Sequence, residues 1–349
     1  MIRLRLGLLA LVVLTPVPAA AAPSPPDTLR VLTFNMMYEP ALAGGGLAAR
    51  WPLIVDLLRD SDADLIALQE VLPGRIEPLR QALPGYEFAV SAPAGNGTWP
   101  SPFVLGLGAF LLAFAAAVGF ALHRRSSRLL GAWLGVIVLG SGVFITQRLA
   151  LVGTLGVPSE LLVLASKRDH LQRGRSQTMW LSSTPLRPGT HGRFDTGPHI
   201  VLLADFIGPD GQSLRVLNVH VGHSPLERSR AAQVLRRILD PSFVQRQILL
   251  GDLNATPDNP LLSQLHAPRP LKSGFRDAWV ESERRSGPAT TYHWTRPARD
   301  FLPLRIDYVL LRGPVRAIDA RVEGRQRGDA VASDHDALIV DLELPREGQ

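Results

Sequence analysis

The sequence predicts an α/β fold in which two packed β-sheets carry helices on their outer faces and an inserted transmembrane hairpin interrupts the domain. Ten short segments rich in Val, Ile and Leu recur along the 349-residue chain, as strands do. Only three segments have apolar residues at helical spacing. Many strands with few helices fold most simply as layers with the helices outside. A long uncharged block in the first half of the chain predicts the insertion.

The expected strands and helices lie outside two apolar blocks. The last helix has the best-marked start, because Ser224 stands at the N-cap, Pro225 at the first helical position, and Glu227 completes a capping box. Residues 168–195, rich in Arg, Ser, Thr, Pro and Gly, predict a long mobile connection. Strands are expected at residues 29–35, 65–70, 86–90, 161–166, 199–207, 214–220, 247–250, 305–311, 315–322 and 337–344, and helices at 51–59, 76–83 and 226–239.

The first apolar block, residues 1–22, predicts an export signal. Arg3 and Arg5 precede an apolar run at 6–17, and the alanines at 19–22 are small enough for cleavage. The alternative is an uncleaved signal anchor, which leaves the rest of the chain on the same side of the membrane. We therefore expect the rest to be extracytoplasmic, either periplasmic or at the cell surface.

The second apolar block predicts a transmembrane hairpin inserted at residues 99–152. No charged residue occurs from 88 to 122, and a helix over residues 103–122 is about 30 Å long, the thickness of a bilayer core. An arginine-rich turn separates this run from a second uncharged run at 129–147. If the N-terminal part is exported, the turn lies in the cytoplasm, as the positive-inside rule requires. A buried hairpin in a soluble core, or one lying in the interface, is the alternative.

The basic excess of the chain belongs to these two blocks. The chain has 37 Lys and Arg against 31 Asp and Glu, a formal charge of +6, but the signal and the hairpin hold six basic residues and no acidic one. The remainder, residues 23–98 and 153–349, is formally neutral and has the size of one domain. Net charge therefore does not indicate a nucleic-acid partner. With 0 Cys, thiolate metal sites and cysteine nucleophiles are excluded.

Polar residues that are costly to bury stand at the ends of several expected strands. A carboxylate at the end of an apolar strand needs a partner, a cation or water. Each residue alone has a plain structural explanation, such as an exposed strand end, a turn cap or a core histidine. Several together indicate one shared site. They are Asn35, Glu70, His220, Asp252, Asn254, Asp307, Asp334 and His335.

The types of these residues predict phosphate chemistry with a hard metal ion. Asn35, Glu70 and Asp334 offer oxygen ligands that suit Mg²⁺, with Mn²⁺ as the alternative. The absence of Cys and of a paired-histidine helical motif argues against zinc. His335 titrates near neutral pH and can transfer protons if a carboxylate orients it. Displacement at phosphorus needs a nucleophile, a stabilised leaving oxygen and charge neutralisation between them.

The order of the motifs resembles the endonuclease/exonuclease/phosphatase, or DNase I-like, superfamily over most of the chain outside the signal and hairpin. The motifs are Thr-Phe-Asn at 33–35, Leu-Gln-Glu-Val at 68–71, Asn-Val-His at 218–220, Gly-Asp-Leu-Asn at 251–254, Arg-Ile-Asp-Tyr at 305–308 and Ser-Asp-His at 333–335. The resemblance implies a four-layer sandwich of two mostly antiparallel sheets flanked by helices. It implies these roles: Asp307 orients His335, Asp252 positions or deprotonates the attacking water, Asn254 and His220 hold phosphate oxygens, and Glu70, Asn35 and Asp334 govern the metal.

Two departures from the family pattern bear on the substrate. Members that cut at abasic DNA sites tend to carry an acid two residues after the first asparagine, where this chain has Met37, so a DNA-repair function is disfavoured. The stretch 161–167 resembles the family's central strand, but Leu161 stands where a glycine is usual and Lys167 where an arginine is usual. We expect Lys167 to contact substrate phosphate as a point charge, without the fork of arginine.

We therefore expect a membrane-anchored, Mg²⁺-dependent phosphodiesterase that resembles the sphingomyelinase-type members and acts outside the cytoplasm. An insertion whose ends rejoin neighbouring strands holds the catalytic face near the bilayer through residues 103–152, which favours a phospholipid or another membrane-proximal phosphate ester. An anchored or secreted metal-dependent nuclease is the first alternative. A non-catalytic membrane protein that keeps the fold for binding is the second. Nothing in the sequence indicates an oligomer.

Overall fold

The computed structural model describes most of the chain outside the N-terminus and the apolar insertion. The described residues are 28–37, 46–95, 159–192, 195, 197–239, 244–268, 274–293 and 303–345. The expected export signal at 1–22 and the hairpin at 99–152 lie outside them. Within the described part, no helix combines the length and the apolar character needed to cross a membrane.

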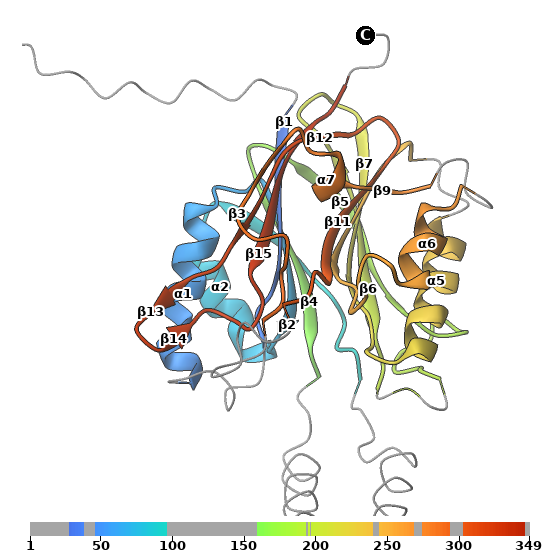
Figure 1. Cartoon of the computed structure of the whole chain (residues 1–349), viewed down its shortest axis with the longest axis horizontal. Coiled ribbons are helices and arrows are strands. Elements are labelled where there is room, and N and C mark those ends of the chain that lie inside the picture. Colours follow the sequence, from blue (N-terminus) through green and yellow to red (C-terminus); the bar gives the residue numbers. More distant parts are fainter. Residues whose placement is uncertain are drawn as a thin grey trace, which may run out of the picture.

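The described residues form two large sheets, a small two-stranded sheet and the helices that cover the large ones (Figure 1). The strands are β1 (Thr28–Asn35), β2 (Leu65–Val71), β3 (Tyr86–Val90), β4 (Leu161–Lys167), β5 (Gln172–Trp180), β6 (Ile200–Ile207), β7 (Ser213–His220), β8 (Arg246–Asp252), β9 (Arg276–Asp277), β10 (Arg284–Ser286), β11 (Asp307–Arg312), β12 (Arg316–Glu323), β13 (Gln326–Arg327), β14 (Ala330–Val331) and β15 (Ala337–Glu343). The helices are α1 (Gly46–Asp60), α2 (Ile76–Ala82), α5 (Pro225–Leu239), α6 (Pro260–His266) and α7 (Ala278–Glu281), with a 3₁₀ turn, η1 (Pro73–Arg75).

The two large sheets are mixed but mostly antiparallel. The first has the strand order β10-β12-β15-β1-β2-β4-β3, and the second has the order β5-β6-β7-β8-β11-β9. Only the neighbours β1 and β2, β7 and β8, and β10 and β12 are parallel among the described strands. Figure 1 shows α1 and α2 on the outer side of the first sheet and α5 and α6 on the outer side of the second. This is the four-layer α/β sandwich that the sequence predicts.

Strand alternation divides the apolar side chains between three buried layers. On β1, Leu29 and Val31 join the core between the two sheets, whereas Leu32 and Phe34 pack in the layer that includes α1. This is the two-residue period of a strand with both faces covered. A third cluster lies between the second sheet and helices α5 and α6. Because Phe34 is fully buried, its replacement by Ala is expected to cost about 3–5 kcal/mol of stability.

All ten expected strands and all three expected helices are present, with small shifts at their ends. The expectation for residues 168–195 is wrong, because Gln172–Trp180 forms β5. This strand is polar because it lies at the edge of the second sheet, pairs only with β6 and exposes most of its side chains. Its sequence therefore lacks the apolar alternation that revealed the other strands. The short helices α6 and α7 were also not anticipated.

The two ends of the insertion meet at one edge of the sandwich. The antiparallel neighbours β3 and β4 flank it in sequence. Beyond β3, the backbone N–H of Ser91 donates to the carbonyl of Leu162 (2.9 Å), and that of Gly95 donates to Ser159 Oγ (2.9 Å). Gly95 and Ser159, the described residues on either side of residues 96–158, are therefore adjacent.

Candidate active site

Three neighbouring strands of the second sheet place His220, Asp252 and Asp307 in one row. The parallel pair β7 and β8 aligns His220 with Asp252, and the antiparallel pair β8 and β11 aligns Asp252 with Asp307. Two residues earlier on β8, Leu250 lies in the core between the sheets. Because side chains alternate, Asp252 faces the same interior. Polar groups thus replace apolar ones where the inter-sheet core reaches its edge, as the strand-end pattern predicts.

Glu70 reaches this row from the first sheet through a local distortion of β2. Its φ of 55° lies in the left-handed region, which is uncommon for a residue other than glycine. The pairing of β2 with β4 also shifts register between Leu68 and Val71, as in a β-bulge. The preceding residue, Gln69, points between the sheets and donates to Asn218 Oδ1 (2.7 Å). The distortion lets two consecutive side chains face the interior, so Glu70 is aimed at the site.

Asn35, at the end of β1, joins the two sheets. Its Nδ2 donates to Glu70 Oε1 and to Asp252 Oδ2, at 3.0 Å each. Its Oδ1 accepts the backbone N–H of Met37 (2.9 Å). Asn35 therefore lies within the expected metal cluster, but its amide nitrogen, and not its oxygen, faces the two carboxylates. Its role as a metal ligand stays a prediction.

His335 and Asp307 form a buried pair. Nδ1 of His335 donates to Asp307 Oδ2 (2.8 Å), and its Nε2 lies 3.7 Å from Asp252 Oδ2. Burial alone lowers the pKa of His335, but the charge and hydrogen bond of Asp307 outweigh it and raise the pKa well above its usual value. The raised pKa favours the protonated ring of His335, whose Nε2 lies beside Asp252. The pKa of Asp252 is raised by burial and by the charge of Asp307.

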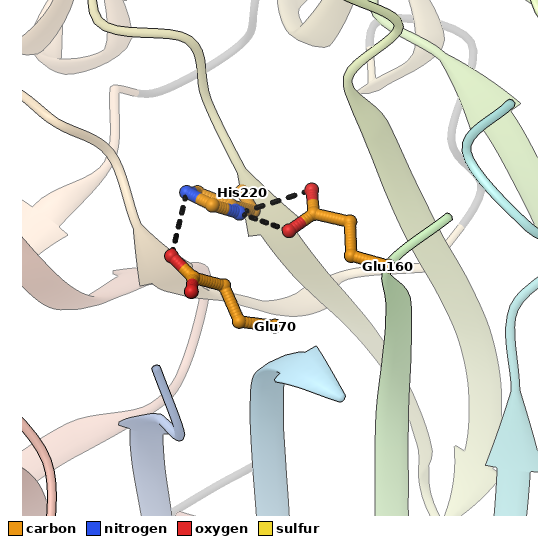
Figure 2. A group of neighbouring side chains, drawn as sticks. All are labelled: Glu70, Glu160 and His220. Carbon is orange, nitrogen blue, oxygen red and sulfur yellow. Dashed lines mark hydrogen bonds and ion pairs between the residues drawn. The ribbon is translucent and has the colours of Figure 1, made fainter. Parts of the chain in front are cut away.

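His220 has a carboxylate on either side (Figure 2). Its Nδ1 donates to both oxygens of Glu160 (3.0 and 3.1 Å), while its Nε2 lies 3.9 Å from Glu70 Oε1 and 3.7 Å from Asp252 Oδ2. Burial lowers the pKa of His220, but the charge and hydrogen bond of Glu160, with Asp252 and Glu70, raise it to about 10. Its Nε2 is buried without a hydrogen-bond partner. This N–H is therefore an unused donor between Glu70 and Asp252.

Sequence reasoning missed Glu160. Its signal was present, because it is an acidic residue directly before an apolar strand, β4, that starts where β2 ends. In this stretch the family resemblance pointed to Lys167, at the far end of the same strand. Tyr292 is a second residue of the site that is absent from the predicted set. Its ring meets that of His335 edge to face at 5.0 Å, and it lines the cleft described below.

The turn after β8 is held by its own polar side chains. Asp252 Oδ1 accepts the backbone N–H of Asn254 (2.8 Å), and Asn254 has a φ of 47°. Asn254 Nδ2 donates to the carbonyl of Val221 (2.7 Å), so this amide ties β8 to the end of β7. Gly251 precedes the turn at a φ of 135°, and a Cβ there would lie 2.0 Å from the carbonyl oxygen of Val219. Only glycine fits between these strands, which explains the Gly-Asp-Leu-Asn motif.

A buried arginine, Arg50, supports the site from behind. It lies on α1, is fully buried, and donates to the carbonyls of Met36, Met37 and Ala332. These carbonyls follow Asn35 and precede Asp334, so the guanidinium joins the two segments that carry these residues. Burial lowers the pKa of Arg50, and the charges of Asp334 and Glu70 act in the opposite direction.

The site opens into a cleft of about 440 Å³. Two larger hollows of about 520 Å³ lie elsewhere on the described surface, and neither contains a member of this cluster. We place the chemistry in the smaller cleft because it collects the paired and strained residues. It is lined by Glu70, His223, Arg228, Asp252, Asn254, Thr256, Asn259, Tyr292, Leu304, Ile306, Asp334 and His335.

The charges in and around this cleft fit a bound cation. Five carboxylates face two histidines whose pKa values are raised, and Arg50 behind them and Arg228 in the cleft lining offset two of the other three negative charges, which leaves an excess of one. A buried excess of this kind is unstable without a proton or a metal ion, and the raised pKa of Asp252 is a sign of it. Two groups have ligand atoms close enough to hold an ion, one made by Glu70, Glu160 and His220 and the other by Asp252, Asp307 and His335. Asp334 belongs to neither but lines the same cleft as Glu70.

Lys167 is the one predicted site residue that the structure places elsewhere. Because β4 runs antiparallel to β2, residue 161 lies beside Val71, near the site, and Lys167 ends the strand at the opposite edge. There its Nζ binds Asp62 Oδ1 (2.8 Å) and Asp64 Oδ1 (3.1 Å). The expectation that Lys167 contacts substrate phosphate in this site is therefore wrong, since the direction of its strand removes it.

Two sheets with an acid- and histidine-rich cleft at their shared edge agree with a phosphoric ester hydrolase, and the family match shows this class. The chain belongs to the Endonuclease/Exonuclease/phosphatase family, whose model matches residues 32–335. Enzymes of this family use divalent metals, which agrees with the charge in the cleft. No curated protein matches the sequence significantly.

Solved structures share the fold at low identity. An endonuclease/exonuclease/phosphatase from Bacteroides vulgatus matches with a TM-score of 0.66 and 19% identity over 91% of this chain and 99% of its own. A mannosyl-6-phosphatase from Bacteroides thetaiotaomicron matches with a TM-score of 0.61 and 18% identity over 90% and 99%. A D. rerio TDP2 complexed with a single-strand DNA product matches with a TM-score of 0.56 and 14% identity over 91% and 99%.

Proposed function

We propose that this protein is a membrane-anchored, Mg²⁺-dependent phosphodiesterase that acts on the extracytoplasmic side. Its substrate would be a phospholipid or another phosphate ester held at the membrane. The observation that carries the proposal is the position of the insertion. Gly95 and Ser159, where the apolar segment leaves and re-enters, are hydrogen-bonded to each other beside Glu160, which holds His220.

The length of the connecting chain supports a substrate close to the membrane. The first apolar run of the insertion starts at residue 103, eight residues after Gly95. Eight extended residues span at most about 29 Å. If that run enters a bilayer, Gly95, at the edge of the sandwich that carries Glu160, lies within that distance of the membrane surface. An enzyme fixed at this height meets membrane-bound esters far more often than dilute soluble ones.

The residues of the cleft can divide the work of displacement at phosphorus. Glu70, Asp334 and Asn35 would hold a Mg²⁺ ion, which supplies charge neutralisation when bound. Asp252, with its raised pKa, is suited to accept a proton from the attacking water. Protonated His335 can donate through Nε2 to an oxygen of the phosphate group, and Asp307 holds the ring in that orientation. The Nε2–H of His220 and the amide of Asn254 would hold the other phosphate oxygens.

A nuclease is the second candidate, because one solved structure of the same fold carries a single-strand DNA product. The formal neutrality of the chain outside its apolar blocks argues against it. A salt titration separates the two candidates. A nuclease should bind DNA at low salt and lose affinity steeply as salt rises, whereas absence of binding at low salt excludes this function.

The proposal is tested by hydrolysis of a substrate panel with Mg²⁺. The panel contains phospholipids in vesicles, single-stranded DNA, inositol phosphates and a sugar phosphate, and the proteins are the full chain and its Asp252→Ala variant. We expect cleavage of a vesicle phospholipid by the wild type and a loss of several orders of magnitude in the variant. Cleavage of DNA alone would replace the proposal with the nuclease, and cleavage of monoesters alone would replace it with a phosphatase.

A further inference from the structure

Two exposed leucines lie at the same edge of the sandwich as the active site. Four large apolar side chains are exposed in the described part of the chain, and the most exposed is Leu186, at 67%. Leu226, which also lies near the site, is 54% exposed, whereas Ile207 and Val280 lie elsewhere. Single exposed leucines are common on protein surfaces and need no explanation by themselves. The surroundings of these two leucines, described next, indicate a function for them.

Leu186 lies in a loop whose two ends, Trp180 and Ile200, are level with His220 at the end of β7. Trp180 pairs with Ile200, and β6 pairs with β7 so that Val201 stands opposite Val219, one residue before His220. The loop between Trp180 and Ile200 therefore lies beyond the catalytic edge. It has internal hydrogen bonds, since Thr190 Oγ1 bonds to Ser182 Oγ (2.6 Å) and to the carbonyl of Arg187 (2.8 Å). Leu186 is thus presented by a defined turn.

Leu226 lies beside this loop. It is in the first turn of α5, which starts five residues after His220 at the end of β7. One turn further along the same helix, Arg230 binds Asp195, which belongs to the loop. Residues four apart share a helix face, so Leu226 stands on the side of α5 that meets the loop.

The insertion leaves the sandwich from the same place. A Cβ on Gly95 would touch Gly189 Cα (3.1 Å) and Pro198 Cγ (3.2 Å), so the start of the insertion lies against the loop of Leu186. Trp180 Nε1 also donates to the carbonyl of Ala94 (2.6 Å). Gly95, the last described residue before the apolar segment, therefore lies against the loop that carries Leu186.

We propose that Leu186, Arg187 and Leu226 form a bilayer-contacting surface around the mouth of the active site. The leucines enter the interfacial region of the membrane, and Arg187 meets lipid phosphates. Arg187 is exposed and makes no ion pair within the described part of the chain. Apolar side chains next to an exposed arginine are a combination that suits a phospholipid surface. The proposal rests on the proposed membrane anchoring, and it specifies which edge of the protein faces the lipid.

The absence of cysteine from the chain makes a direct test possible. Leu186→Cys and Leu226→Cys each provide a single site for an environment-sensitive fluorophore on the full chain in phospholipid vesicles. Ile207→Cys is the matched control, because residue 207 is exposed at 38% on the second sheet and lies at the far end of β6 from the site. We expect blue-shifted emission, and quenching by spin-labelled lipids, at 186 and 226 but not at 207.

Emission at 186 and 226 that matches the control would overturn the proposal. A second measurement separates this failure from failure of the proposed activity. The Leu186→Ser/Leu226→Ser variant should lose about tenfold in turnover of a vesicle phospholipid but keep wild-type turnover of a water-soluble phosphodiester. Equal losses on both substrates would contradict the surface role. Lipid-exposed labels without hydrolysis of any ester would leave the surface standing and remove the activity.

Discussion

Glu160 Oε2 lies 3.0 Å from Nδ1 of His220, and Glu160 directly follows Ser159. The Oγ of Ser159 accepts the backbone N–H of Gly95, the last described residue before the insertion. A group that controls the charge of an active-site histidine is therefore placed by the point at which the insertion re-enters the fold. This explains why an insertion of this size is compatible with the site. Its ends are fixed beside β4, and the residue before that strand, Glu160, holds His220.

The Glu160→Gln substitution should lower both the pKa of His220 and the activity. Without the carboxylate, burial dominates, so the pKa should fall from about 10 toward or below its usual value. Loss of a group that orients a site residue typically costs about 10- to 100-fold in activity. NMR titration of the His220 ring in metal-free protein and turnover of a soluble phosphodiester measure the two effects. Glu283→Gln, at an exposed position, is the control and should leave both unchanged.

The His335→Ala substitution should abolish most of the activity and spare the fold. Proton transfer by a positioned side chain contributes about 10²- to 10⁴-fold, and this variant removes the imidazolium completely. Circular dichroism and thermal unfolding should show a folded protein with near-normal secondary structure. Turnover close to that of the wild type would remove His335 from the mechanism.

The Asp307→Asn substitution should change how stability depends on pH. The pKa of His335 is raised in the folded protein, so its pair with Asp307 contributes fully below the unfolded pKa of about 6.5 and is lost as pH rises through the raised value. The difference in unfolding free energy between wild type and variant should therefore be largest near pH 6 and shrink at higher pH. Urea unfolding of both proteins in a chelator, across this range, checks the sign. A difference that grows with pH would contradict the assignment.

The Arg50→Met substitution should destabilise the whole domain. Three backbone carbonyls would lose their donor in a fully buried place, and each unsatisfied buried group costs about 1–3 kcal/mol. A total loss of at least about 3 kcal/mol is expected from denaturant unfolding. The exposed Arg327 provides the control, because Arg327→Met should change stability by less than about 0.5 kcal/mol.

Strand alternation made most of the fold predictable. Residues such as Leu29 and Val31 alternate with Leu32 and Phe34 between two buried layers, and that burial gives both sheets an apolar pattern in the sequence. β5 was missed because it is an edge strand. Such a strand forms backbone hydrogen bonds with one neighbouring strand only, and its side chains can remain polar. The burial that reveals a strand was absent there.

The site was predictable where polar residues interrupt this apolar pattern, and it was unpredictable where strand direction decides the outcome. Asp252 and Asp307 come together because the end of β8 pairs with the start of its antiparallel neighbour β11. Lys167 and Glu160 flank the same strand, β4, and only its antiparallel pairing with β2 determines which end lies in the site. A motif comparison favoured Lys167, and the topology favours Glu160. The bulge at Glu70 likewise depends on pairing that the sequence does not display.

The most direct test of the account is Mg²⁺-dependent hydrolysis of a phospholipid by the full chain in vesicles, with Glu70→Gln and a chelator as controls. The account predicts lipid cleavage that a chelator abolishes and added Mg²⁺ restores. It predicts a large loss in the Glu70→Gln variant, together with a smaller rise in unfolding temperature on adding Mg²⁺ than in the wild type. Cleavage that persists in the chelator, or a folded wild type that cleaves soluble esters but no vesicle lipid, would contradict it.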